Sequence, residues 1–138
     1  MAFTVCYYHV VWATKNRTEW LTPDVEACVL TSIRQTSTTL KSPIYALNAC
    51  ANHVHVAVDI NTTLAPSDWI GRVKGSATRQ VNKTILSLDG QFRWQKSYGL
   101  LTFGTKNLAF VVDYIERQKE HHAYGTIEPY LENTGEDE

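Results

Sequence analysis

The 138-residue sequence contains little that would assign it to a specialised class of protein. Its three cysteines, Cys6, Cys28 and Cys50, are an odd number without a C-x-x-C pair, which favours reduced structural thiols in a cytosolic protein. No apolar run approaches the roughly 18 residues of a membrane span, and no charged and apolar leader opens the chain. We therefore expect a soluble, cytoplasmic protein with no membrane partner.

The chain also lacks a large net charge, because 13 basic and 14 acidic residues give −1. The charges are unevenly distributed, since every Lys and Arg precedes Thr126 and five acids follow it. Residues 1–127 consequently carry a formal +4 from 13 basic and 9 acidic groups, which mildly favours an anionic partner such as nucleic acid. From Gly125 onward the chain is acidic, and we expect a poorly packed, flexible tail.

Hydrophobic periodicity predicts one domain with four strands and three helices. Strands are expected at residues 3–14, 44–50 and 53–60, with a fourth in two pieces, 92–94 and 98–103. Helices are expected from Thr22 to about Leu40, from residues 64–68 through Val81, and from Leu108 to about His121. This order predicts an α+β fold, a ferredoxin-like split βαβ sandwich with an antiparallel sheet and an additional C-terminal helix. Both crossover helices would cover one face of the sheet.

The stretch from Asn52 to Ile60 carries the first candidate site. Side chains alternate between the faces of a strand, so the valines and Ile60 form one apolar face, and His53 and His55 project from the other. The two imidazoles would lie about 7 Å apart along the backbone, close enough to share a divalent ion. Histidines on a solvated sheet face are the alternative. We expect the His-bearing face to be free for a site.

The predicted third helix carries the second candidate site. Leu108, its valines and Ile115 form the apolar stripe that packs on the core. Tyr114 and Gln118 lie one turn apart and turned away from that stripe, so a phenol and an amide oxygen share a face. A half-exposed tyrosine that only packs its ring is the alternative interpretation.

The sequence resembles the single-tyrosine HUH transposases of small bacterial insertion sequences (IS200 type) and their domesticated, palindrome-associated relatives. The resemblance extends from Tyr8 to His122. Its pieces are YHVVWATKNR (Tyr8–Arg17), NHVHVAV (Asn52–Val58), VKGSATR (Val73–Arg79), FRWQKSYG (Phe92–Gly99) and YIERQKEHH (Tyr114–His122). Two departures affect the residues before the first histidine, where Cys50-Ala51 replaces the usual Met-Pro and Asn52 replaces a common acid.

The resemblance implies a role for each candidate residue. His53, His55 and Gln118 would bind a divalent metal, Mg²⁺ or Mn²⁺, and Tyr114 would be the nucleophile. Residues 1–124 would form one HUH domain, with 125–138 as the tail. It also implies a homodimer whose active site is shared between subunits. DNA contacts would come from basic residues that otherwise form solvated surfaces, namely Lys15, Arg17, Arg72, Lys74, Arg79 and Lys83.

The expected function is cleavage and rejoining of single-stranded DNA at hairpin-bearing ends through a 5′-phosphotyrosine. Two alternatives stay open. One is a domesticated protein of the same fold that binds hairpins with little or no strand transfer. The other is a metal-dependent phosphodiesterase that uses water, with Tyr114 as a structural residue.

Overall fold

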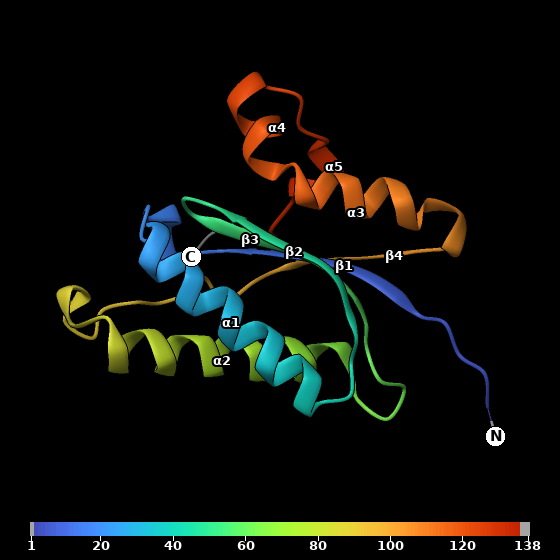
Figure 1. Ribbon diagram of the computed structural model, residues 1–138, viewed down its shortest axis with the longest axis horizontal. Coiled ribbons are helices and arrows are strands. Elements are labelled where there is room, and N and C mark those ends of the chain that lie inside the picture. Colours follow the sequence, from blue (N-terminus) through green and yellow to red (C-terminus); the bar gives the residue numbers. More distant parts are fainter. Residues whose placement is uncertain (1, 136–138) are drawn as a thin grey trace.

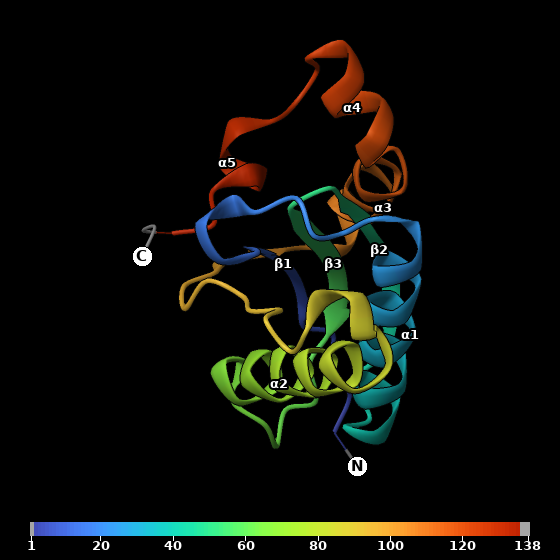
Figure 2. The ribbon, with the colours of Figure 1, turned by 90° about the vertical axis from the view of Figure 1, so that its left-hand side faces the viewer.

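A four-stranded antiparallel sheet of strand order β2-β3-β1-β4 forms the centre of the computed structural model, which describes residues 2–135. Its strands are β1 (Tyr7–Ala13), β2 (Ile44–Cys50), β3 (His53–Asp59) and β4 (Gly99–Phe103). The helices are α1 (Pro23–Thr39), α2 (Pro66–Thr84), α3 (Leu108–Glu116), α4 (Gln118–Tyr124) and α5 (Pro129–Glu132). Helices α1 and α2 cover one face of the sheet, and α3, α4 and α5 lie on the other (Figures 1 and 2). The predicted α+β, ferredoxin-like sandwich is confirmed.

The face beneath α1 and α2 holds the main core. Val54, Val56 and Val58 are fully buried there, and residues of both crossover helices pack against them. Because these valines occupy alternate positions of β3, the residues between them must face the other side of the sheet. The register of β3 is therefore fixed by its apolar stripe, which leaves His53 and His55 on the face that carries α3.

Helix α3 packs on the second face through a smaller core made by Ala46, Ala57, Val111 and Ile115. The Asn48 side-chain amide on β2 donates to the carbonyls of Ile115 and Glu116, each at 3.1 Å. These bonds add partners to carbonyl groups in the last turn of α3, where intrahelical hydrogen bonding ends.

Three predicted elements differ in extent from the structure. The helix expected from Leu108 to His121 is interrupted at Arg117 (φ −104°, ψ 24°), so α3 and α4 are separate helices. Strand β1 begins at Tyr7 rather than Phe3, and residues 92–94 contribute only one bridge, between Thr14 and Trp94.

Lys119, just past the interruption at Arg117, anchors the start of α4. Its ammonium donates to the Ala49 carbonyl at 3.0 Å and pairs with the Glu26 carboxylate at 2.7 Å.

The C-terminal segment (residues 126–135) departs from the expected poorly packed tail. Leu131 and Thr134 are buried, and the Arg17 guanidinium donates to the Thr134 hydroxyl at 3.0 Å. The backbone of Asn133 approaches β4 so closely that a Cβ atom on Gly99 would lie 1.9 Å from its carbonyl oxygen. Glycine inside a strand is typical of such a close approach by another backbone. Residues 136–138 of the predicted tail lie outside the described residues.

None of the helices in residues 2–135 combines the length and the apolar character needed to cross a membrane.

Candidate metal centre and tyrosine site

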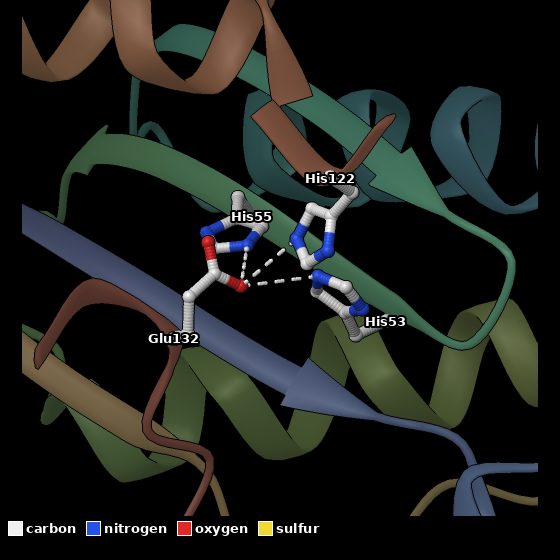
Figure 3. Close-up of side chains that lie close together, drawn as sticks. All are labelled: His53, His55, His122 and Glu132. Atoms are coloured by element: carbon white, nitrogen blue, oxygen red, sulfur yellow. Dashed lines mark hydrogen bonds and ion pairs between the residues drawn. The ribbon is translucent and has the colours of Figure 1, made fainter. Parts of the chain in front are cut away.

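Four potential metal ligands converge between β3, α4 and α5: His53, His55, His122 and Glu132 (Figure 3). Glu132 Oε1 lies 3.2 Å from His53 Nε2, 3.1 Å from His55 Nε2 and 3.3 Å from His122 Nε2. One ligand atom from each residue lies within 4.8 Å of all the others. Three imidazoles and one carboxylate therefore surround a common point.

The two strand histidines are oriented by neighbours that bond to their Nδ1 atoms. Asn52 Oδ1 lies 2.7 Å from His53 Nδ1, and His9 Nε2 shares a 2.9 Å hydrogen bond with His55 Nδ1. Both Nε2 atoms are consequently directed at Glu132. Such bonds to the distal ring nitrogen fix the ring orientation of metal-binding histidines. Asn52, which replaces the acid common in the family, retains an oxygen for this bond.

The His-bearing face is not free, contrary to the expectation from the sequence. His53 is 3% exposed and His55 is fully buried. The reason is that α3 and the C-terminal segment both pack on this face and bring Glu132 onto the imidazoles.

Tyr114 is buried beside the cluster instead of half-exposed. Its hydroxyl donates to Glu132 Oε2 and accepts a hydrogen bond from the backbone N–H of Glu128 at 2.8 Å. The ring stacks on His121, with ring centroids 4.5 Å apart, and lies 6.1 Å from the His55 ring. A single carboxylate thus contacts the phenol through one oxygen and the imidazoles through the other.

Gln118 begins α4 and is fully buried. Its Nε2 donates to the Tyr114 carbonyl at 3.2 Å, whereas its Oε1 has no hydrogen-bond partner among the described residues. The structure places Gln118 beside the tyrosine, with a buried amide oxygen left unpaired.

Burial and the Glu132 carboxylate shift the ionisation of these groups. Burial opposes ionisation of Glu132, but the adjacent His53 and His55 imidazoles outweigh it and hold its pKa well below the usual value. Burial lowers the pKa of His55, and burial together with His55 lowers that of His9 to about 3. Burial and the adjacent Glu132 raise the pKa of Tyr114 to about 12. The site therefore favours the neutral form of His55 and of the Tyr114 phenol and the ionised form of Glu132.

The donor set fits a divalent transition metal. Neutral imidazole and carboxylate are ligands that Zn²⁺, Mn²⁺ and similar ions accept. His53 Nε2 and Gln118 Oε1 are buried without a hydrogen-bond partner in the described part of the chain, although the former lies near Glu132. Buried polar atoms without partners are costly, and a bound ion would satisfy such atoms.

The predicted DNA-contacting residues fall into two groups. Lys15 and Arg17 are exposed on the turn after β1, whose last residue, Ala13, is paired with His53. Arg72, Arg79 and Lys83 are exposed on α2, across the sheet from the cluster (Figure 2). Lys74 differs, because its ammonium donates to the carbonyls of Gln95, Lys96 and Ser97 at 2.7, 3.5 and 3.3 Å and fastens that loop to α2.

Three residues of the site were absent from the sequence-based candidates: His9, His122 and Glu132. His9 shares a face of the sheet with His55 only because β1 pairs with β3, and the alternation of β1 offered a signal for it. His122 was visible as a residue one turn beyond Gln118. Glu132 carried no local signal, because its place depends on the fold of the C-terminal segment.

Together, the α+β sandwich, the ligand cluster and the adjoining phenol define a candidate catalytic centre of the tyrosine type. Residues 2–118 match the family model described as "Transposase IS200 like". This chain belongs to the IS200-like transposase family.

Individual relatives agree with this assignment. The transposase of insertion sequence IS200 from Salmonella typhimurium is 27% identical over 124 residues, covering 87% of this chain and 81% of the relative. The ISDra2 transposase TnpA of Deinococcus radiodurans is 24% identical over 117 residues, covering 82% and 84%.

Solved structures are also similar. A crystal structure described as a putative transposase from D. radiodurans R1 superposes with a TM-score of 0.69 at 25% identity, covering 86% of this chain and 95% of that one. A REP-associated tyrosine transposase bound to a REP hairpin has the same TM-score at 16% identity, covering 90% and 72%, and shares the fold.

Proposed function

We propose that this chain cleaves and rejoins single-stranded DNA at hairpin-bearing element ends, with Tyr114 as the nucleophile and a divalent metal, Mg²⁺ or Mn²⁺, as cofactor. The observation that carries the proposal is the shared carboxylate: Glu132 contacts the Tyr114 hydroxyl through Oε2 and the Nε2 atoms of His53 and His55 through Oε1. A phenol and a candidate ion site are therefore adjacent within one chain.

The residues can carry out a balanced transfer. The Tyr114 oxygen forms a bond to phosphorus while the bond from phosphorus to the 3′ oxygen breaks, and the phenolic proton passes to the hydrogen-bonded Glu132 carboxylate. The departing 3′ oxygen takes a proton from water. The covalent 5′-phosphotyrosine conserves the energy of the broken ester, so a 3′ hydroxyl can reverse the step and rejoin the strand. When bound by His53 and His55, with Gln118 as the ligand implied by the resemblance, the ion supplies Lewis-acid stabilisation of the phosphate charge.

Tyr114→Phe tests the nucleophile. Labelled single-stranded DNA from the flanks of the gene is incubated with protein and divalent ion and resolved by denaturing electrophoresis. Wild type should form a covalent protein–DNA adduct, and the variant should form none while still binding DNA. Tyr98→Phe is the matched control and should retain the adduct. An adduct with Tyr114→Phe, or its loss with Tyr98→Phe, would contradict the assignment.

We also propose a homodimer, as the resemblance implies, and whether its active site is shared between the subunits has its own test. A variant lacking both strand histidines (His53→Ala and His55→Ala) is mixed with Tyr114→Phe. A shared site regenerates one complete centre and restores the adduct, whereas a site formed within one chain does not. The placement of Tyr114 beside His55 in a single chain favours the second outcome.

Hairpin DNA is the proposed substrate because a REP-associated tyrosine transposase of the same fold is bound to a REP hairpin. Lys15 and Arg17 follow β1, whose last residue is paired with His53, and the basic row on α2 offers a second surface. Because phosphate contacts dominate such binding, its affinity should fall steeply with salt.

A hairpin-binding protein with little strand-transfer activity is the second candidate. The burial of His53 and His55 beneath the C-terminal segment favours it, because a phosphate must reach the imidazoles to react. Hairpin binding without any adduct in Mg²⁺ or Mn²⁺ would support this alternative. Cleaved DNA without attached protein would instead indicate hydrolysis by water.

A further inference from the structure

We infer that His122 and Glu132 complete the metal site as ligands, so that the resident ion is held by three imidazoles and one carboxylate in place of His53, His55 and Gln118. Of the two ions proposed above, this set favours Mn²⁺, or a similar transition metal, over Mg²⁺. This inference deepens the proposed function, and it rests on that function for the catalytic use of the ion. Binding of the ion itself can be measured without DNA.

The distances around Glu132 are the first evidence that it is a ligand. Oε1 lies 3.1–3.3 Å from the Nε2 atoms of all three histidines. Ligand atoms about 2.0–2.2 Å from a tetrahedral ion are separated by about 3.3–3.6 Å. Oε1 therefore lies within about 0.2 Å of the shortest ligand–ligand spacing of a coordinated ion with respect to each imidazole. All ligand atoms of the set lie within 4.8 Å of one another, so the widest pairs must approach by up to about 1.2 Å when an ion binds.

The chain positions the two additional ligands independently of each other. His122 is on α4, which starts at the interruption after α3 and is anchored by Lys119 to β2. Glu132 ends α5, where Leu131 is buried and Asn133 packs against Gly99. Two consecutive helices, each with its own anchor on the sheet, thus bring ligand atoms to the Nε2 atoms of His53 and His55 (Figure 3). A surface carboxylate that only met a histidine by chance would not have a second and a third imidazole at the same distance.

The chemistry of the donor atoms indicates which metal the site prefers. Imidazole is a good ligand for Zn²⁺, Mn²⁺, Co²⁺ and related ions, whereas Mg²⁺ takes oxygen ligands and keeps several waters. Three nitrogens and a single carboxylate oxygen give Mg²⁺ few of the ligands it prefers. The same set is suited to a borderline transition metal.

Cobalt titration tests the inference, because the visible absorption of Co²⁺ reports both binding and coordination number. Apo protein, freed of metal with a chelator, is titrated with Co²⁺ and then challenged with millimolar Mg²⁺ and with Zn²⁺. We expect a one-to-one complex with the intense bands of four- or five-coordinate Co²⁺, which Zn²⁺ displaces and Mg²⁺ does not. Weak bands of six-coordinate Co²⁺, or displacement by Mg²⁺, would overturn the inference.

Ligand variants identify the residues. Glu132→Gln and His122→Asn should each weaken Co²⁺ binding at least about tenfold, the smallest effect common for lost partners of a metal site. Glu128→Gln and His121→Asn remove a carboxylate and an imidazole from neighbouring positions outside the cluster and should bind Co²⁺ like wild type. Circular dichroism and thermal melts verify that each variant is folded, and a variant that fails to fold is replaced by Glu132→Ala or His122→Gln.

Unchanged Co²⁺ affinity in folded Glu132 and His122 variants would refute the role of these ligands. If Glu132→Gln also gave a higher yield of DNA adduct, the carboxylate would be a competitor of the substrate phosphate. If the ion binds as inferred but no DNA adduct forms, the proposed strand transfer is disproved and the metal-site inference stands. Failure of the inference and failure of the proposed function therefore give different results.

Discussion

Replacing Gly99 by alanine should detach the C-terminal segment, and Glu132 with it, although no residue of the candidate site is itself substituted. In an ordinary strand this change would be neutral or would stabilise by roughly 0.5–1 kcal/mol, because glycine loses more backbone entropy on folding. Here the new Cβ would lie 1.9 Å from the Asn133 carbonyl oxygen and 2.8 Å from Val11 Cγ1. A carbon and a carbonyl oxygen come into contact at about 3.3 Å, so the two backbones must separate by about 1.4 Å.

We expect the C-terminal segment, rather than β4, to move away. Its release gives up the burial of Leu131, about 1.5–3 kcal/mol, and the hydrogen bond from Arg17 to Thr134, about 0.5–1.5 kcal/mol. A shift of β4 would instead disturb its ladder with β1. We therefore expect Gly99→Ala to remain folded, with a free energy of unfolding lower by at least about 2 kcal/mol, because the contacts of Glu132 with Tyr114 and the strand histidines are lost as well.

Hydrogen exchange measured by mass spectrometry checks this expectation, with urea denaturation for the free energy. In Gly99→Ala the amides of residues 126–135 should exchange much faster than in wild type, while those of β1 and β3 keep their protection. Gly104→Ala is the matched control, because a Cβ there meets nothing within 4 Å. Unchanged exchange in residues 126–135 of the Gly99 variant would refute the reasoning.

Three further perturbations have defined outcomes. Asn48→Ala removes two hydrogen bonds to carbonyls at the end of α3 and should lower the free energy of unfolding by about 1–2 kcal/mol, measured in urea. Arg79→Gln removes an exposed charge on α2 and, if hairpin phosphates lie there, should reduce the slope of log K against log salt by about 0.7 without changing stability. Burial holds the pKa of His9 at about 3 in the folded chain against about 6.5 for an ordinary histidine, so the unfolded chain binds the proton first as pH falls. The stability of metal-free protein should therefore be complete above about pH 6.5 and decline toward pH 3 by up to about 1.4 kcal/mol per unit, and His9→Gln should flatten that decline.

Hydrophobic periodicity in the sequence predicted the helices and strands that bury a continuous apolar stripe of their own. The valines of β3 specified the strand and its orientation, and the Thr22-Pro23 start predicted α1 within a residue or two. The interruption at Arg117 could not be predicted this way, because it depends on tertiary contacts made by Asn48 and Lys119 from outside the apolar stripe. For the same reason Tyr114 looked half-exposed in the sequence, although in the folded chain it is covered by a distant segment.

The acidic tail illustrates where composition stops being informative. Five acids after Thr126 give a stretch that has too little apolar surface to fold by itself. One buried leucine and one glycine on β4 are nevertheless enough to dock its first part, because the sheet supplies the remaining surface. The acid that this docking delivers, Glu132, then lies 77 residues from His55 in sequence and 3.1 Å from it in space. Gly99 was the available clue, since a glycine within a predicted strand indicates that another backbone passes close by.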